Sequence, residues 1–271
     1  MMSAFGESMI MIETIHPIPA FTDNYIWAIT EKGSNKACVV DPGDAAPVIE
    51  YLAREGLILS DILITHHHLD HTGGIRQLCN KYSPRVFGPE SSNIEGITDF
   101  VVEGDCVELF GQSFSVLEIP GHTLDHIAFF SADQDQPTPI LFCGDTLFAA
   151  GCGRLFEGSP AMMCSSLKKL SSLDTNTKVY CTHEYTLANL QFALAAEPDN
   201  DALLKRNQFE LVKRNKGLPT LPSSIELEIA TNPFIRCDKE TLVTTARNRL
   251  GREPEDETEV FSTLRAWKDT F

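Results

Sequence analysis

Apolar positions follow a strand-like pattern through the first two thirds of the chain and a helix-like pattern afterwards. Short apolar or alternating runs, separated by turns rich in Gly, Asn and Asp, predict strands as far as about residue 183. The first three of these strands are expected to form an antiparallel meander. The predicted strands are 10–19, 25–30, 36–40, 61–65, 85–88, 106–109, 113–119, 127–131, 140–143 and 178–181.

Helices are predicted in two places among the strands and throughout the remainder of the chain. One spans 45–55, with Asp44 as its N-cap and Gly56 as its stop, and another spans 71–82. We therefore predict two domains, 1–183 and 184–271. The helices expected in the second domain are 185–197, 201–216, a short one opened by a capping box at Ser223–Glu226, 239–250, and a last one opening at Asp256 and running through Lys268.

Charge is distributed unevenly along the 271 residues, whose formal net charge is −16. Residues 1–200 hold 10 Lys and Arg against 26 Asp and Glu, whereas residues 201–271 hold 12 against 12. An acidic first domain argues against a nucleic-acid partner, because phosphate binding needs clustered positive charge. The basic residues of the second domain can still form a local anion site.

Segments that would direct the chain to a membrane or to the secretory route are not evident in the sequence. The apolar runs are too short to span a bilayer, and residues 1–9 lack the basic flank and apolar block of a signal peptide. The eight cysteines form no Cys-x-x-Cys pair, so most should be reduced, buried and chemically idle. We expect a cytoplasmic monomer with no membrane partner.

A dense set of metal-ligand side chains lies in the stretch Thr-His-His-His-Leu-Asp-His at residues 65–71. Alternate side chains at a strand end can face the same point, so His66 and His68 are predicted to share one ion, and Asp70 and His71 to serve a second. His67, between the first two, is interpreted as a bystander. The alternative of a solvated histidine-rich turn is less favoured, because turns of that kind do not require this spacing.

Three further strands deliver one such side chain each, and these are His122, Asp145 and His183. With His66 and His68, His122 completes a three-histidine set that leaves a coordination position open, as catalytic metals require. His183 joins Asp70 and His71, and Asp145 can bridge two divalent ions. Imidazole and carboxylate ligands suit Zn, Fe and Mn about equally.

Other candidate residues are weaker when taken singly. His16 and His126 do not follow a strand in this way and are interpreted as structural. Asp41 ends the run Val39–Val40 and has two interpretations of similar weight. It either accepts a hydrogen bond from a ligand imidazole or forms a plain Asx turn before Pro42.

The motifs resemble those of a known enzyme family. Segments 65–71, 120–123, 144–146 and 182–184 are similar to the ligand motifs of the metallo-β-lactamase superfamily, and 18–27, 145–154 and 183–186 resemble those of glyoxalase II, the hydroxyacylglutathione hydrolases. The resemblance implies an α/β (α+β) fold, an αββα metallo-β-lactamase-like sandwich with a C-terminal helical domain. It also implies two divalent ions, with zinc favoured over Fe or Mn.

The same resemblance implies the reaction and the substrate contacts. The expected reaction is hydrolysis of S-D-lactoylglutathione, and of other 2-hydroxyacylglutathiones, to D-lactate and glutathione, the second step of methylglyoxal detoxification. Arg154, Tyr185, Arg265 and Lys268 occupy the positions of the glutathione contacts. The sequence departs from the family at Phe156, where some members present a tyrosine hydroxyl, and at Asp125, where Gly is usual.

The mechanism expected from these residues uses a hydroxide that bridges two ions, with Asp70 and Asp145 as the catalytic carboxylates. Three alternatives remain open at this point. They are another hydrolase on the same fold, such as a lactonase or β-lactamase, a persulfide dioxygenase with one iron, and a non-catalytic metal-binding module.

Overall fold

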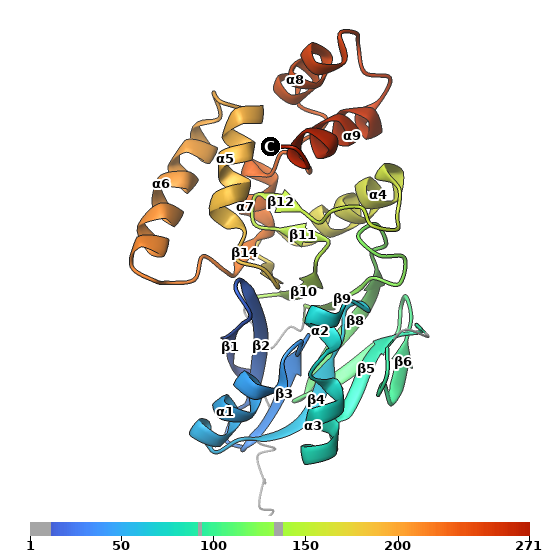
Figure 1. The fold of residues 1–271 in the computed structure, drawn as a ribbon, viewed down its shortest axis with the longest axis vertical. Coiled ribbons are helices and arrows are strands. Elements are labelled where there is room, and N and C mark those ends of the chain that lie inside the picture. Colours follow the sequence, from blue (N-terminus) through green and yellow to red (C-terminus); the bar gives the residue numbers. More distant parts are fainter. Residues whose placement is uncertain (1–11, 92–93, 133–137) are drawn as a thin grey trace, which may run out of the picture.

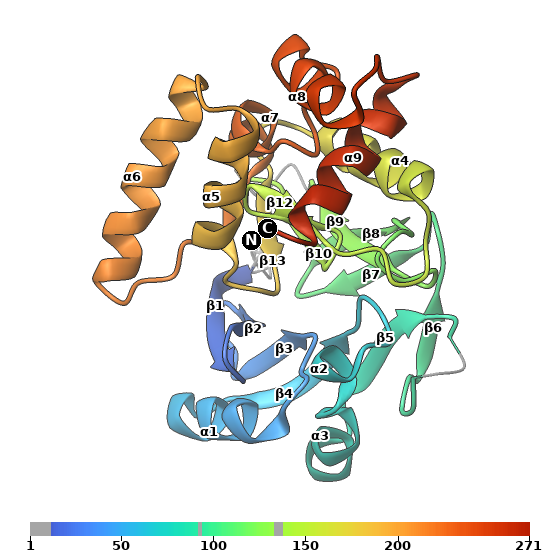
Figure 2. The same ribbon diagram turned by 45° about the horizontal axis from the view of Figure 1, so that its top comes forward.

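The computed structural model describes residues 12–91, 94–132 and 138–271. Two six-stranded sheets pack face to face, and helices cover the outer face of each, so that the layers run helix, sheet, sheet, helix (Figures 1 and 2). The predicted αββα sandwich is therefore present. The first nine residues, for which the sequence predicts no leader peptide, and residues 10 and 11 of the first predicted strand lie outside the described part of the chain.

The first sheet combines an antiparallel meander with a parallel half. β1 to β3 pair antiparallel, as predicted, and β3 to β6 pair parallel. Parallel strands end at the same edge of a sheet, and in this protein that edge carries the histidine-rich loop. In sheet order the strands are β1 Ile12–Ala20, β2 Asn24–Glu31, β3 Lys36–Val40, β4 Ile58–Leu63, β5 Arg85–Pro89 and β6 Asp99–Val101.

The helices on the first sheet depart from the prediction at one point. α1 (Ala45–Glu55) has the predicted bounds, with Asp44 accepting a hydrogen bond from Ala46 N and Gly56 in the left-handed conformation. The single helix predicted at 71–82 is wrong, because α2 (Leu69–Thr72) and α3 (Ile75–Tyr82) are separated at Gly73 and Gly74. The break follows from close packing on the loop after β3, where Gly74 N donates to Pro42 O and leaves the helical pattern.

The second sheet has a hairpin and a helix beside it that the sequence did not predict. Its strands, in sheet order, are β14 Ser223–Ser224, β13 Lys178–Cys181, β10 Ile140–Gly144, β9 Ile127–Ser131, β8 Gln112–Glu118 and β7 Cys106–Leu109. The hairpin pairs β11 (Leu147–Phe148) with β12 (Gly151–Cys152). The helix, α4 (Pro160–Ser171), is capped by Ser159, begins with a proline and buries Met163, Leu167 and Leu170.

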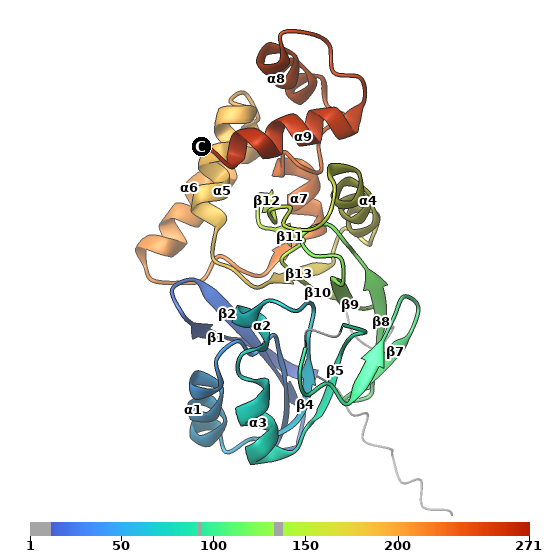
Figure 3. The same ribbon diagram turned by 45° about the vertical axis from the view of Figure 1, so that its right-hand side comes forward.

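Five helices follow β13. In Figure 3, α9 crosses above β12 with α8 beside it. Their bounds are α5 Thr186–Ala196, α6 Asp201–Asn215, α7 Ile225–Thr231, α8 Glu240–Leu250 and α9 Glu257–Lys268. The capping box predicted at Ser223–Glu226 is displaced by one residue, because Ser224 is the N-cap and accepts from Leu227 N. Ser223 lies in β14, and its hydroxyl binds Glu228 instead.

The apolar core is continuous from the sandwich into these helices. Trp27 and Phe142 belong to the buried cluster between the sheets, and Phe192 of α5 and Phe261 of α9 belong to the same cluster. The segment after residue 183 also supplies β14 to the second sheet. The division into domains 1–183 and 184–271 therefore remains a prediction, and the packing crosses it.

Two other sequence expectations can be compared with the described residues. All eight cysteines are free thiols, and six of them are buried, as the cysteine spacing predicted. None of the described helices is long and apolar enough to span a membrane.

Candidate metal centre and substrate cavity

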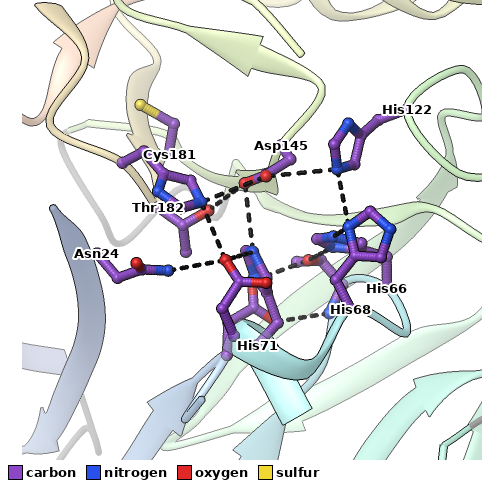
Figure 4. A network of polar contacts seen from close by, with 12 residues as sticks. Asn24, His66, His68, His71, His122, Asp145, Cys181 and Thr182 are labelled. Atoms are coloured by element: carbon purple, nitrogen blue, oxygen red, sulfur yellow. Dashed lines mark hydrogen bonds and ion pairs between the residues drawn. The ribbon is translucent and has the colours of Figure 1, made fainter. Parts of the chain in front are cut away.

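The seven predicted ligand side chains converge at one edge of the sandwich, where strand ends from both sheets meet (Figure 4). The view shows His66, His68, His71, His122 and Asp145 directed toward one another. β4 leads into the loop and short helix that carry the first four ligands, and β8, β10 and β13 each lead to one more. The seven are His66, His68, Asp70, His71, His122, Asp145 and His183.

Three imidazoles form the first group. His68 Nδ1 lies 3.1 Å from His66 Nε2 and 3.0 Å from His122 Nε2. Nitrogens bound to one tetrahedral zinc lie about 3.3 Å apart, given bonds of about 2.0–2.1 Å. The spacing of these nitrogens therefore fits a single ion with one position left open.

Asp70, His71 and His183 form the second group, and Asp145 lies between the two groups. Asp70 Oδ2 is 3.4 Å from His71 Nε2 and 3.5 Å from His183 Nε2. Asp145 Oδ1 is 3.4 Å from His71 Nε2. Asp145 Oδ2 is 3.3 Å from His183 Nε2 and 3.4 Å from His122 Nε2. This is the arrangement expected of a carboxylate shared by two ions.

Hydrogen bonding at His71 is another indication that a cation fits here. Its side chain is fully buried, and neither ring nitrogen makes a well-aligned hydrogen bond within the described residues, although Asp41 Oδ2 lies 3.1 Å from Nδ1. Burying an unpaired polar group is costly, so such groups normally have a partner. A divalent ion at His71 Nε2 supplies one.

The pKa values of the clustered imidazoles indicate which of them carry a proton that a bound metal would replace. Burial lowers the pKa of His66 and of His68. Burial also opposes charge on His183, but Asp145 and Asp70 outweigh it and raise the pKa to about 10. In the same way Asp145 and Asp41 raise the pKa of His71 well above its usual value. Metal binding must therefore release protons from His71 and His183.

Asp41 is positioned to orient a ligand, which is one of its two predicted interpretations. It takes a left-handed backbone conformation with φ of 53°. Its carboxylate accepts from the backbone N and the hydroxyl of Thr65, both at 2.8 Å, and Oδ2 lies 3.1 Å from His71 Nδ1. This geometry favours the orienting role, which remains a prediction.

Sequence reasoning missed several residues that support the ligands. Asp23 Oδ1 lies 2.8 Å from His183 Nδ1, and Asn24 donates to Asp70 Oδ2 at 3.1 Å. Thr182 donates to Asp145 Oδ1 at 2.8 Å. The segment holding Asp23 and Asn24 had only the composition of a turn, and nothing local indicated that it reaches His183, 160 residues away.

His126, interpreted as structural, packs directly against the centre. Its ring stacks on that of His66 with centroids 4.5 Å apart, and its Nε2 accepts from Asp145 N at 3.0 Å. Burial lowers its pKa to about 3, so it remains a neutral acceptor. Gly144 permits the approach of His126, because a Cβ at residue 144 would lie only 2.8 Å from Cε1 of the His126 ring.

A cavity of about 760 Å³ extends from the ligands toward α9. Arg154, Arg265 and Lys268 line it, as do the ligands His68, His122 and Asp145. The cavity therefore has a metal-binding part and a cationic part.

The three cations differ in how far they are engaged by the protein. Arg265 is buried and donates to Cys152 O at 2.9 Å and to Asp269 Oδ1 at 3.0 Å. Arg154 is exposed, with its Nε 3.6 Å from the same oxygen of Asp269. Lys268 has no ion pair within the described residues, and burial, followed by the charge of Arg265, lowers its pKa to about 8. The substrate contacts assigned to these side chains remain predictions.

Aromatic side chains flank the ligands. Tyr185 stacks on His183 with centroids 4.7 Å apart and rings 6° from parallel. Burial raises the pKa of its phenol, so the hydroxyl remains protonated. Phe156 is 63% exposed and meets the rings of His68 and His122 edge to face. It lines the cavity without offering a hydrogen bond.

Comparison with known proteins gives this geometry its context. Residues 21–183 match the family described as the metallo-beta-lactamase superfamily, and residues 184–271 match the one described as hydroxyacylglutathione hydrolase C-terminus. A hydroxyacylglutathione hydrolase of Chromohalobacter salexigens is 52% identical over 263 residues, which cover 95% of this chain and 99% of the relative. The chain belongs to the hydroxyacylglutathione hydrolase family.

A second relative agrees with this assignment, and a solved structure shares the fold. A hydroxyacylglutathione hydrolase of Pseudomonas paraeruginosa is 51% identical over 258 residues, covering 95% of this chain and 99% of the relative. The crystal structure of ETHE1 from Myxococcus xanthus matches with a TM-score of 0.63 and 22% identity, over 95% of this chain and 99% of that one. At that identity the likeness concerns the fold alone. As a hydroxyacylglutathione hydrolase family member, the chain is a hydrolase that binds divalent metal, and the predicted family and fold class are confirmed.

Proposed function

We propose that this chain hydrolyses S-D-lactoylglutathione to D-lactate and glutathione at a centre of two divalent ions, with zinc the favoured metal. The observation that carries the proposal is the composition of one cavity. Five of the seven metal-ligand side chains line one part of it, and the cations of Arg154, Arg265 and Lys268 line another. Glutathione carries two carboxylates, and its thioester carries the bond to be cleaved.

The ligands divide between the two ions as their distances suggest. His66, His68 and His122 would hold one ion, and Asp70, His71 and His183 the other. Asp145 faces both groups. When bound, such ions polarise the thioester carbonyl and bring the pKa of water down toward about 7.

The protein's own groups hold the reactants in place. Asp145 and Asp70 are proposed as the catalytic carboxylates. Burial opposes charge on Asp145, but His71 and His183 keep its pKa well below the usual value, so it stays ionised. Thr182 and His126 fix its side chain and its backbone. Water that has lost a proton to solvent adds as hydroxide to the thioester carbon, the carbon–sulfur bond breaks, and glutathione leaves as a thiolate, which needs little help from an acid. The lactic acid formed then loses its proton to give D-lactate.

The cationic part would bind the peptide of the substrate. Lys268 is available, because no carboxylate of the described residues pairs with it, and Arg154 is exposed beside it in the cavity lining. Tyr185 retains its proton and can donate a hydrogen bond. Because the body of the protein is acidic, these cations are needed to hold a peptide that carries two carboxylates.

One experiment separates this proposal from the alternatives. The purified enzyme would be assayed for bound metal, for thioester hydrolysis and for oxygen uptake with a persulfide substrate. Two ions with hydrolysis and no oxygen uptake support the proposal, whereas one iron with oxygen uptake supports a dioxygenase. Hydrolysis of lactones or β-lactams in preference to the thioester would support the other hydrolases.

A variant tests the place of Asp145 in the scheme. Asp145→Asn should lose metal or at least a hundredfold in kcat, because the amide carries no charge to share between two ions. If Asp145→Asn retained both ions and full turnover, the proposed scheme would be wrong.

A further inference from the structure

His67, interpreted from the sequence as a bystander, is held between two carboxylates. Its Nδ1 lies 2.9 Å from Asp125 Oδ1 and its Nε2 lies 3.5 Å from Glu157 Oε1. The side chains of His67 and Asp125 are only 17% and 13% exposed.

The second oxygen of Glu157 extends the contact to the backbone. Glu157 Oε2 accepts from Leu124 N at 2.8 Å, two residues after His122. We call His67, Asp125 and Glu157 the His67 clamp. It joins the loop after β4, the turn after β8 and the segment after β12.

Each of these three segments also contacts the first ligand group. The loop after β4 supplies His66 and His68, and the turn after β8 supplies His122. In the segment after β12, Arg154 O lies 2.8 Å from His122 Nδ1, and Phe156 packs edge to face on His68 and His122. The clamp therefore links the three segments whose relative positions set the distances among these imidazoles.

We propose that the His67 clamp is a positioning unit for the ion held by His66, His68 and His122. The inference rests on the proposed function and deepens it. Residues that orient metal ligands also affect metal affinity, and their loss typically weakens metal binding by about ten- to a hundredfold.

A third cation held by the same three side chains is the competing interpretation, since their ligand atoms lie within 4.8 Å of one another. The geometry favours the direct contact. His67 presents different ring nitrogens to the two carboxylates, and the one that faces Asp125 is in direct hydrogen-bond contact with it. A metal ion binds through one imidazole nitrogen.

The test measures metal retention, without substrate. Zinc-loaded wild-type enzyme, Asp125→Ala, Asp125→Asn and His67→Ala would be titrated with a chelator, and bound zinc counted by mass spectrometry. His16→Ala is the matched control, because His16 stacks on Tyr51 away from the ligands. Melting temperatures would be recorded for the same proteins.

Asp125→Ala and His67→Ala are expected to release one of two ions about tenfold more readily than wild type, with the other ion unaffected. Asp125→Asn should retain wild-type affinity, since its amide oxygen still accepts, and the double variant His67→Ala, Asp125→Ala should be no weaker than either single one. His16→Ala should leave both ions unchanged.

Three results would overturn the inference. Wild-type retention in both alanine variants would mean that the clamp positions nothing. Equal loss of both ions with a lowered melting temperature would indicate general destabilisation. Three ions per wild-type chain would indicate a cation site. If instead the thioester were not hydrolysed, the metal measurements would still stand, so the two proposals fail separately.

Discussion

Lys268 offers a direct test of how the cavity recognises its substrate. Its ammonium lies 5.2 Å from the centre of the Phe192 ring, without an ion pair among the described residues, and its pKa is lowered to about 8. Lysine is a cation below its pKa. The charge available to a substrate carboxylate is therefore present at pH 7 and is lost as pH rises through about 8.

The size of the effect follows from that pKa. Lys268 is about 90% charged at pH 7 and about 10% charged at pH 9. A hydrogen bond to a charged group contributes about 1.5–3 kcal/mol, or about ten- to a hundredfold in affinity. Weighting this contribution by the charged fraction predicts that affinity for a glutathione analogue falls about five- to tenfold from pH 7 to pH 9.

The assay is calorimetric binding of S-methylglutathione, which has both carboxylates, no titrating thiol and no thioester. Lys268→Met should bind about ten- to a hundredfold more weakly than wild type at pH 7, with a flat profile. Lys268→Arg, charged over the whole range, should also be flat. Any slope seen in both variants belongs to the ligand and is subtracted. Equal slopes in wild type and Lys268→Met would refute the reasoning, and with it the assignment of the cationic part to the substrate.

Further predictions concern metal, thiol and buried charge. Chelation should abolish hydrolysis but leave the room-temperature circular dichroism spectrum unchanged, because the ligands lie on loops over an apolar core; unfolding would contradict this. His122→Ala should reduce bound metal from about two ions to about one by elemental analysis. Cys143→Ala should retain kcat per bound metal, since burial raises the pKa of that thiol well above its usual value; lost turnover at normal metal content would assign it a catalytic role. Glu228→Ala should cost about 3–5 kcal/mol in urea unfolding by leaving Arg206 buried and unpaired, whereas the exposed Glu226→Ala should cost under about 0.5 kcal/mol; equal costs would contradict a role for the buried pair.

Features that depend on neighbouring residues in sequence could be predicted. α1 was predicted with its correct bounds, because Asp44 caps its start and Gly56 allows the left-handed turn at its end. The convergence of the ligands at one edge was also anticipated, since strand ends of one sandwich meet there.

Features that depend on contacts between residues distant in sequence could not be predicted from the sequence. The break at Gly73 and Gly74 is set by the loop at Pro42, and the cap at Ser224 is set by the pairing of β14 with β13. The supports at Asp23 and Asn24 are likewise visible only once the turn before β2 is placed beside His183. α4 is an exception, because Ser159 and Pro160 are ordinary local signals of a helix start.

The β11–β12 hairpin has a consequence for attempts to exchange parts between related enzymes. Its carbonyls at Phe148 and Gly151 accept from Asn232, and Cys152 O accepts from Arg265, so both ends of the hairpin are fastened to the C-terminal segment. A chimera joined at residue 184 would separate these donors from the acceptors they fit. To redesign substrate choice, residues 147–152 and the C-terminal helices should therefore be transferred together from the same parent enzyme, although they are distant in sequence.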